Sequence, residues 1–167
     1  AFDDTITTTE DIPVIIPVRD NDTDLDVGDT LSIVGFSTPS KGNVTNTGNV
    51  LIYTPTLNIT GVDHFNYTIS DGALTDTASI TVTIFSLNDP PVAVDDVSST
   101  LEDKEVEIQA MNNDYDPDGD AIFISAVAVP ENGGISTHGI NIRYTPELDF
   151  YGQDVFSYTL SDGEATD

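Results

Sequence analysis

One pattern occurs twice along the chain, and this internal repeat limits the fold more than any other feature of the sequence. The segment AFDD at 1–4 returns as AVDD at 93–96, and YTP at 53–55 returns at 144–146. The longest match pairs GVDHFNYTISDG at 61–72 with GQDVFSYTLSDG at 152–163. A long internal repeat indicates tandem copies of one structural unit. We therefore predict one domain over 1–88 and a second over 89–167.

The polarity of the residues predicts an all-β protein. Apolar and polar residues alternate over 12–18, 31–37, 42–46, 50–54, 64–70 and 78–85, with turn-forming residues between these runs. Val, Ile, Thr, Phe and Tyr fill the runs, as is typical of strands. We expect each repeat to be a seven-stranded Greek-key sandwich of the immunoglobulin-like type. Phe65, Tyr67 and Ile69 should point into its core.

The second repeat stops earlier than the first. The first repeat continues with TASITVTIF at 77–85, which is typical of a final strand. We expect the second sandwich to lack this last strand, which a longer polypeptide or another source would supply. If the position stays empty, an exposed sheet edge results, and such an edge could pair with another copy.

The charge of the chain excludes several classes of partner. Asp and Glu total 30, whereas Lys and Arg total 4, so the formal net charge is −26. Nucleic acids need a basic footprint, and membrane insertion needs a long apolar run, so we expect neither partner. A charge excess of this size repels itself within a compact fold. Bound cations would offset the repulsion; an acidic surface that is merely solvated is the alternative.

Two acidic loops at matching positions predict cation sites. Residues 114–120 read DYDPDGD, and residues 22–29 read DTDLDVGD. Alternate aspartates in a turn can direct several oxygens at one centre, and Ca²⁺ takes roughly six to eight oxygen ligands. Zinc prefers Cys and His, and Mg²⁺ retains more water. An EF-hand would need Glu where this chain has Ser125 and Ile33. A solvated Asp-Gly turn is the alternative to a calcium site.

Greek-key connections would bring further oxygen ligands to these loops. In the second repeat, the first strand would begin beside the DYDPDGD loop. In the first repeat, Glu10, Asp11 and Asp63 would lie at the end nearest the junction, where Asn88 and Asp89 follow. We therefore expect calcium at and near the boundary between the repeats. The candidate metal ligands are Asp3, Asp4, Glu10, Asp11, Asp22, Asp24, Asp26, Asp29, Asp71, Asn88, Asp89, Asp95, Asp96, Asp114, Asp116, Asp118, Asp120 and Asp162.

The combined pattern resembles the bacterial cadherin-like tandem repeats of large secreted or surface adhesins. Both copies carry A-x-DD, ED, an acidic loop, YTP and the D-x-F-x-Y-T-x-SDG segment. The resemblance implies a seven-stranded sandwich with calcium within or between repeats. The segment LNDPPVA at 87–93 also resembles the linker of animal cadherins. That likeness implies linker ligands at Asn88 and Asp89, with Glu10 before them and Asp116 and Asp118 after them.

These observations predict a calcium-stabilised structural or extender module of an extracellular adhesin. Its partners would be the neighbouring repeats and a cell-surface protein or polysaccharide. We expect no enzyme, because no nucleophile motif of the G-x-S-x-G type occurs and the acidic residues fall in loops. The alternative is a carbohydrate-binding module of a secreted polysaccharide-degrading enzyme, with Phe150 and Tyr151 as its aromatic platform.

Overall fold

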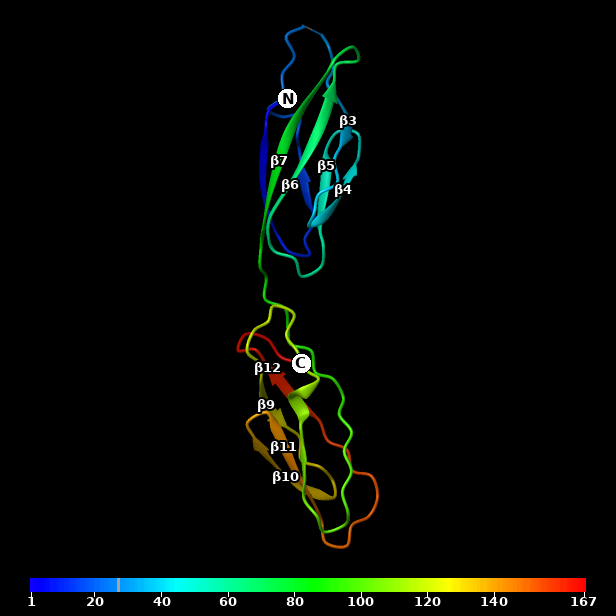
Figure 1. The fold of residues 1–167 in the computed structure, drawn as a ribbon, viewed down its shortest axis with the longest axis vertical. Coiled ribbons are helices and arrows are strands. Elements are labelled where there is room, and N and C mark those ends of the chain that lie inside the picture. Colours follow the sequence, from blue (N-terminus) through cyan, green and yellow to red (C-terminus); the bar gives the residue numbers. More distant parts are fainter. Residues whose placement is uncertain (27) are drawn as a thin grey trace. The chain divides into compact units, whose positions relative to one another are not determined.

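The computed structural model describes residues 1–26 and 28–167 and divides into two compact units, Ala1–Leu87 and Asn88–Asp167 (Figure 1). Val27, in the first acidic loop, lies outside the described residues. Each unit is a β-structure, as the alternating sequence predicts.

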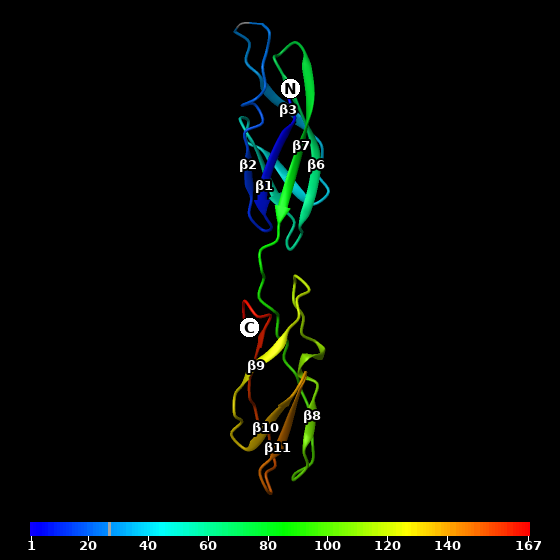
Figure 2. The same ribbon diagram turned by 90° about the vertical axis from the view of Figure 1, so that its left-hand side faces the viewer.

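The first unit is a sandwich of two sheets. One sheet has the order β1-β7-β6-β3, with the bounds β1 (Asp4–Thr9), β7 (Thr75–Phe85), β6 (Gly61–Ser70) and β3 (Ser32–Phe36). The other has the order β2-β5-β4, with β2 (Val14–Ile16), β5 (Leu51–Pro55) and β4 (Gly42–Asn46). Strand β1 runs parallel to β7, and the two lie side by side in Figure 2. The remaining pairs are antiparallel. This arrangement confirms the seven-stranded sandwich for the first repeat.

Apolar side chains from both sheets meet between them. In β6, Phe65, Tyr67 and Ile69 are buried, which confirms the inward face predicted from the alternation. The long β7 strand contributes one buried residue at every second position, because its side chains alternate between the core and solvent. The buried apolar core consists of Ile16, Val18, Ile33, Val44, Leu51, Tyr53, Phe65, Tyr67, Ile69, Ala78, Ile80, Val82 and Ile84.

Six strands of the first unit coincide with the predicted runs, and only their ends differ. The run at 42–46 matches β4, whereas β6 begins at Gly61 rather than at 64. The seventh strand, β1, gave no such signal because its sequence is DTITTT. With a single aliphatic residue, β1 is defined by its pairing with β7 rather than by its own alternation.

The second unit has five strands and one short 3₁₀ helix, η1 (Ala110–Asn112). One sheet has the order β10-β11-β8, with β10 (Gly133–His138), β11 (Asn141–Pro146) and β8 (Val106–Ile108). The other pairs β12 (Tyr158–Ser161) with β9 (Phe123–Val127). Sequence matching makes these strands the counterparts of β4, β5, β2, β6 and β3.

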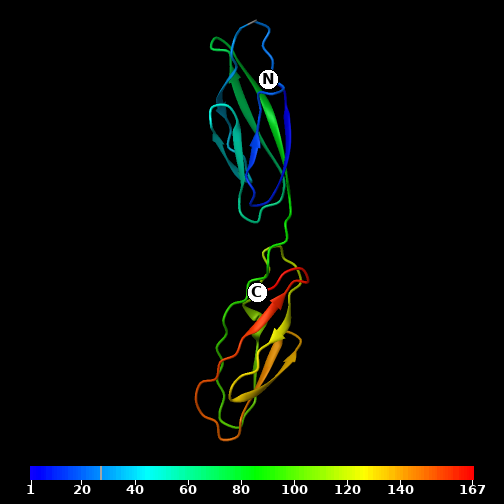
Figure 3. The ribbon, with the colours of Figure 1, turned by 180° about the vertical axis from the view of Figure 1, so that it is seen from behind.

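Two counterparts are therefore absent among the described residues of the second unit. The described residues of the second unit include no strand that corresponds to β7, as the shorter second repeat predicts. The first strand is also absent, because residues 96–101, which match β1, form no strand. Figure 3 draws this segment as a thin green trace without an arrow. Its counterpart β1 is an edge strand that pairs only with β7, so without a β7 counterpart this segment has no strand to pair with.

Candidate metal centre

Each unit gathers three carboxylates in its acidic loop. In the first unit these are Asp24, Asp26 and Asp29, and in the second they are Asp116, Asp118 and Asp120. Within each group, one carboxylate oxygen per residue lies within 4.8 Å of the others. Two oxygens bound on opposite sides of one Ca²⁺ would be about 4.6–5.2 Å apart, given metal–oxygen distances of roughly 2.3–2.6 Å. Both groups therefore fit a calcium ion.

Backbone hydrogen bonds fold the second loop around Asp116. Its Oδ1 accepts the N–H groups of Asp118 at 2.9 Å and Asp120 at 3.3 Å. Gly119 adopts a φ of 80°, the left-handed conformation in which glycine carries no steric cost. The other oxygen of Asp116, Oδ2, is buried and has no hydrogen-bond partner among the described residues. A buried oxygen without a donor is destabilising unless a cation satisfies it.

Basic side chains do not neutralise these loops. Two ion pairs occur in the described part of the chain: the Ala1 amino group with Asp76, and Arg143 with Glu105. Neither pair involves a carboxylate of the two loops. Repulsion between the three neighbouring carboxylates therefore remains uncompensated by the protein itself.

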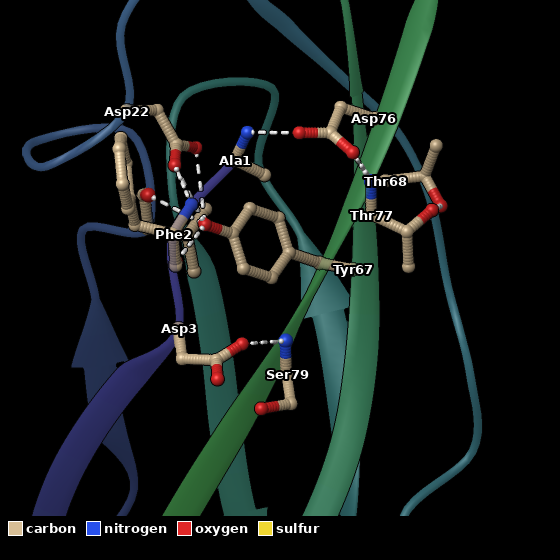
Figure 4. Close-up of polar contacts among 10 residues, drawn as sticks. Ala1, Phe2, Asp3, Asp22, Tyr67, Thr68, Asp76, Thr77 and Ser79 are labelled. Carbon is tan, nitrogen blue, oxygen red and sulfur yellow. Dashed lines mark hydrogen bonds and ion pairs between the residues drawn. The ribbon is translucent and has the colours of Figure 1, made fainter.

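A tyrosine hydroxyl organises the carboxylates beside each loop. In the first unit, the Tyr67 hydroxyl lies 3.0 and 3.1 Å from the two oxygens of Asp22 and donates also toward the backbone oxygen of Phe2 (Figure 4). In the second unit, the Tyr158 hydroxyl lies 3.0 and 3.2 Å from Asp114 and 3.2 Å from Asp96. The sequence analysis placed Tyr67 in the core and assigned no contact with the acidic residues to either hydroxyl. Their recurrence in both repeats was the available signal.

Burial and neighbouring charge make ionisation unfavourable at the start of each unit. Desolvation raises the pKa of Asp4 above its usual value, and the nearby Asp22 and Asp3 charges add to the effect. Desolvation likewise raises the pKa of Asp96, with the Asp114 and Asp95 charges acting in the same direction. The hydrogen bonds from the tyrosines oppose these shifts only in part. Both sites would thus gain from a nearby cation.

Hydrogen bonds connect the first residues of the second unit to its acidic loops. The Asn88 side-chain amide donates to Oδ2 of Asp162 at 2.9 Å, and the Asp89 N–H donates to Oδ2 of Asp118 at 2.7 Å. Asn113 donates to the backbone oxygen of Asp95 at 3.3 Å. The structure therefore brings the predicted residues of the second repeat to one end. They are Asn88, Asp89, Asp95, Asp96, Asp114, Asp116, Asp118, Asp120 and Asp162.

The predicted residues of the first unit fall into two groups. Asp4 and Asp22 lie beside Tyr67, and Asp3 precedes them and accepts the Ser79 N–H. The acidic loop itself holds Asp24, Asp26 and Asp29, while Asp71 accepts the N–H groups of Ala73 and Leu74 in the turn before β7. Glu10 and Asp11 belong to the turn after β1. Glu10 is 1% exposed and accepts the Leu87 N–H at 2.8 Å, while Asp11 accepts the Asn58 N–H at 3.1 Å.

Asp63 has a structural role that its position in the sequence did not reveal. Its oxygens accept hydrogen bonds from the N–H groups of Ser40 and Lys41 and from the Tyr53 hydroxyl, at 2.8–3.0 Å. Burial opposes its ionisation, but these hydrogen bonds outweigh burial and hold the pKa of Asp63 below its usual value. The carboxylate closes the turn before β4 and has little capacity left for a metal ion.

The proposed aromatic platform of the carbohydrate-binding alternative is divided between two environments. Both rings border the cavity of the second unit, but Tyr151 is 86% exposed, whereas Phe150 is half-buried. The pair therefore presents one largely exposed ring.

The comparisons with known proteins agree with the duplicated sandwich. The family model described as "Bacterial Ig domain" matches twice, over residues 1–83 and 88–167. The chain belongs to the bacterial Ig domain family. This family consists of β-sandwich modules that suggest an extracellular extender or adhesion role, and its domains are typically not catalytic. In the described residues, no helix has the length and apolar character that crossing a bilayer would require.

Individual similar proteins extend the comparison. Protein GAMETE EXPRESSED 2 of Arabidopsis thaliana is 42% identical over 93 residues, covering 54% of this chain and 10% of the plant protein. Drosophila N-cadherin EC1-4 aligns with 96% of this chain and 43% of its own, at 16% identity and a TM-score of 0.51. An endo-fucoidan hydrolase of glycoside hydrolase family 107 aligns with all of this chain and 26% of its own, at 22% identity and a TM-score of 0.38. The chain thus spans a small part of these proteins, and the N-cadherin likeness supports the cadherin-like fold.

Proposed function

We propose that this chain is a calcium-stabilised extender module of a secreted or cell-surface adhesin. The observation that carries the proposal is the recurrence of one acidic loop, with three carboxylates in close approach, at the same position of both units. Bound calcium would neutralise these carboxylates and hold each loop against the first residues of its unit. Neighbouring repeats and a cell-surface protein or polysaccharide are the partners that such a module would serve.

The chemistry of the ligands supports calcium over other cations. Every candidate ligand is a carboxylate or amide oxygen, and Cys is absent from the chain. Hard oxygen ligands in an irregular loop suit Ca²⁺, whereas Zn²⁺ favours His and Cys. The buried Oδ2 of Asp116 would be the central ligand of the second loop, with Asp118 and Asp120 beside it.

Thermal unfolding of the chain in calcium and in chelator tests the proposal. Extracellular modules bind calcium with dissociation constants of roughly 10⁻⁴–10⁻³ M. At about 10 mM calcium, each site would then add about 1.4–2.7 kcal/mol to the free energy of unfolding. A shift that sodium chloride reproduces at equal ionic strength would instead support the merely solvated acidic surface.

A double variant tests whether the calcium-dependent stabilisation of the second unit arises from its acidic loop. Asp116→Asn with Asp118→Asn keeps the carbonyl oxygens that accept the loop's backbone hydrogen bonds and removes two charges. The calcium-dependent part of the Tm shift should fall in the second unit and persist in the first. The matched control is Glu131→Gln, an exposed carboxylate outside the loop. Equal calcium responses in the double variant and the control would contradict the proposed site.

A further inference from the structure

The two acidic loops differ in a basic residue at the base of the first. Arg19 is one of the four basic residues of the chain and stands three positions before Asp22. It lines a surface pocket of about 540 Å³ together with Asp22, Asp24, Asp26 and Asp29. A calcium ion held by the carboxylates of this loop would therefore lie near the positive charge of Arg19.

Hydrogen bonds to neutral groups hold the guanidinium of Arg19 in place. Its Nη1 donates to the Leu31 backbone oxygen at 2.7 Å, and its Nη2 donates to Oδ1 of Asn49 at 3.1 Å. Its Nε donates to the Asn49 backbone oxygen at 3.3 Å. Neither of the ion pairs in the described part of the chain involves Arg19. The charge is thus fixed in position and is not cancelled by a carboxylate.

The second loop lacks this charge. Sequence matching pairs Arg19 with Met111 and Asn49 with Ile140, so apolar residues replace both members of the hydrogen-bonded pair. The Met111 N–H donates to the Ile140 backbone oxygen at 3.3 Å, so the two positions remain neighbours in the second unit. The paired replacement removes the positive charge from the base of the second loop.

We propose that Arg19 weakens calcium binding by the first loop, so that the second loop fills at a lower calcium concentration. This inference rests on the proposed function, since both loops must bind calcium. A divalent cation is repelled by a fixed positive charge twice as strongly as a monovalent one. In water, a unit charge about 8 Å from a divalent cation lowers its binding about fivefold. One chain would thus respond to calcium over two concentration ranges.

A calcium titration followed by NMR measures each loop separately, because Gly28 lies in the first loop and Gly119 in the second. At low ionic strength, the Gly119 amide signal should reach half of its total shift at a lower calcium concentration than the Gly28 signal. Arg19→Gln removes the charge but keeps a donor for the Leu31 oxygen, so it should lower the Gly28 midpoint about fivefold. Arg19→Lys keeps the charge and is the matched control, with a Gly28 midpoint within about twofold of wild type.

The reciprocal exchange tests the second loop. Met111→Arg with Ile140→Asn introduces the charge and its hydrogen-bonding partner, and it should raise the Gly119 midpoint about fivefold without changing the Gly28 midpoint. Both effects should shrink in about 0.5 M potassium chloride, because salt screens the charge and leaves the hydrogen bonds intact.

The results separate this inference from the proposed function. Equal Gly28 midpoints in Arg19→Gln and Arg19→Lys would overturn the inference, because the hydrogen bonds of Arg19 rather than its charge would then set the affinity. An unchanged Gly119 midpoint in the reciprocal variant would overturn it as well. If neither glycine responded to calcium in the wild-type chain, the proposed function itself would fail, and this inference with it.

Discussion

Both units contain the same small cluster, here called the polar corner: a tyrosine that donates to an aspartate and stacks on a phenylalanine. The surroundings of this cluster differ between the units. In the first, Tyr53 donates to Asp63 at 2.8 Å, and Tyr53 stacks on Phe65. In the second, Tyr144 donates to Asp154 at 2.9 Å, and Tyr144 stacks on Phe156. The local motif is thus formed equally well in both. Only the first is fully buried, since Asp154 and Tyr144 line the open cavity. Hydrogen bonds and stacking follow the local sequence, whereas burial depends on β7, which has a counterpart in neither sheet of the described second unit.

The two units should differ most in the free energy of unfolding that each loses when the aspartate of its polar corner is replaced by alanine. Asp63→Ala leaves two buried N–H groups and the Tyr53 hydroxyl without an acceptor, so we expect a loss of about 4 kcal/mol from the first unit. Asp154→Ala should cost the second unit about 2 kcal/mol, because water can reach its partners through the cavity. Urea unfolding followed by NMR signals of each unit measures both losses. Equal losses would show that the cavity does not admit water to the corner.

The next contrast isolates β7. Ile80→Ala creates a cavity in the closed core and should cost the first unit about 3 kcal/mol. The second unit should keep its own unfolding midpoint, since no residue of β7 belongs to it. Thr81→Ala, which changes the neighbouring, less buried position of the same strand, is the control and should cost less than about 1 kcal/mol. A similar loss in Thr81→Ala would mean that strand propensity, rather than core packing, sets the contribution of β7.

A smaller contrast concerns the tyrosine hydroxyls beside the acidic loops. Tyr67→Phe removes a buried donor to Asp22, and we expect a loss of about 1.5 kcal/mol. Tyr158→Phe should cost less, because Tyr158 is only half-buried. Each variant should also raise the cation dependence of its own unit, since Asp22 or Asp114 loses a donor. A greater loss of unfolding free energy in Tyr158→Phe than in Tyr67→Phe would mean that the Tyr158 hydroxyl is the more buried of the two.

The smallest expected effect is a change in the free energy of unfolding of the first unit at acidic pH. Hydrogen bonding keeps the pKa of Asp63 lower in the folded than in the unfolded chain, so its contribution is complete above the ordinary value of 3.8. This contribution disappears as the pH falls from 3.8 through the folded pKa. The stability difference between wild type and Asp63→Asn should therefore shrink below about pH 4. Urea midpoints between pH 2 and 6 measure it; a difference independent of pH would mean that the charge of Asp63 is unimportant.

Much of this architecture was accessible from local patterns. The duplication, the strand runs, the inward face of β6 and the acidic loops all follow from short segments, because strand alternation and Asp-Gly turns are local properties. No alternating run marks β1, and the Greek-key order alone predicted it; its threonine-rich segment forms a strand beside β7. The sequence analysis missed the roles of Asp63 and of the Tyr67 and Tyr158 hydroxyls. These roles depend on partners that lie far away in the sequence, and the sequence does not distinguish a buried, hydrogen-bonded aspartate from one that binds a metal ion. The metal ligands themselves stay a prediction.

The sequence by itself determined the repeat, the β-class and the clustering of negative charge, since each is a property of neighbouring residues. Tertiary structure decided which carboxylates the tyrosine hydroxyls contact and whether the segment that matches β1 forms a strand. The residues that match β1 lack a strand in the second unit because the free energy of a strand comes mainly from its partners and from the core that it covers.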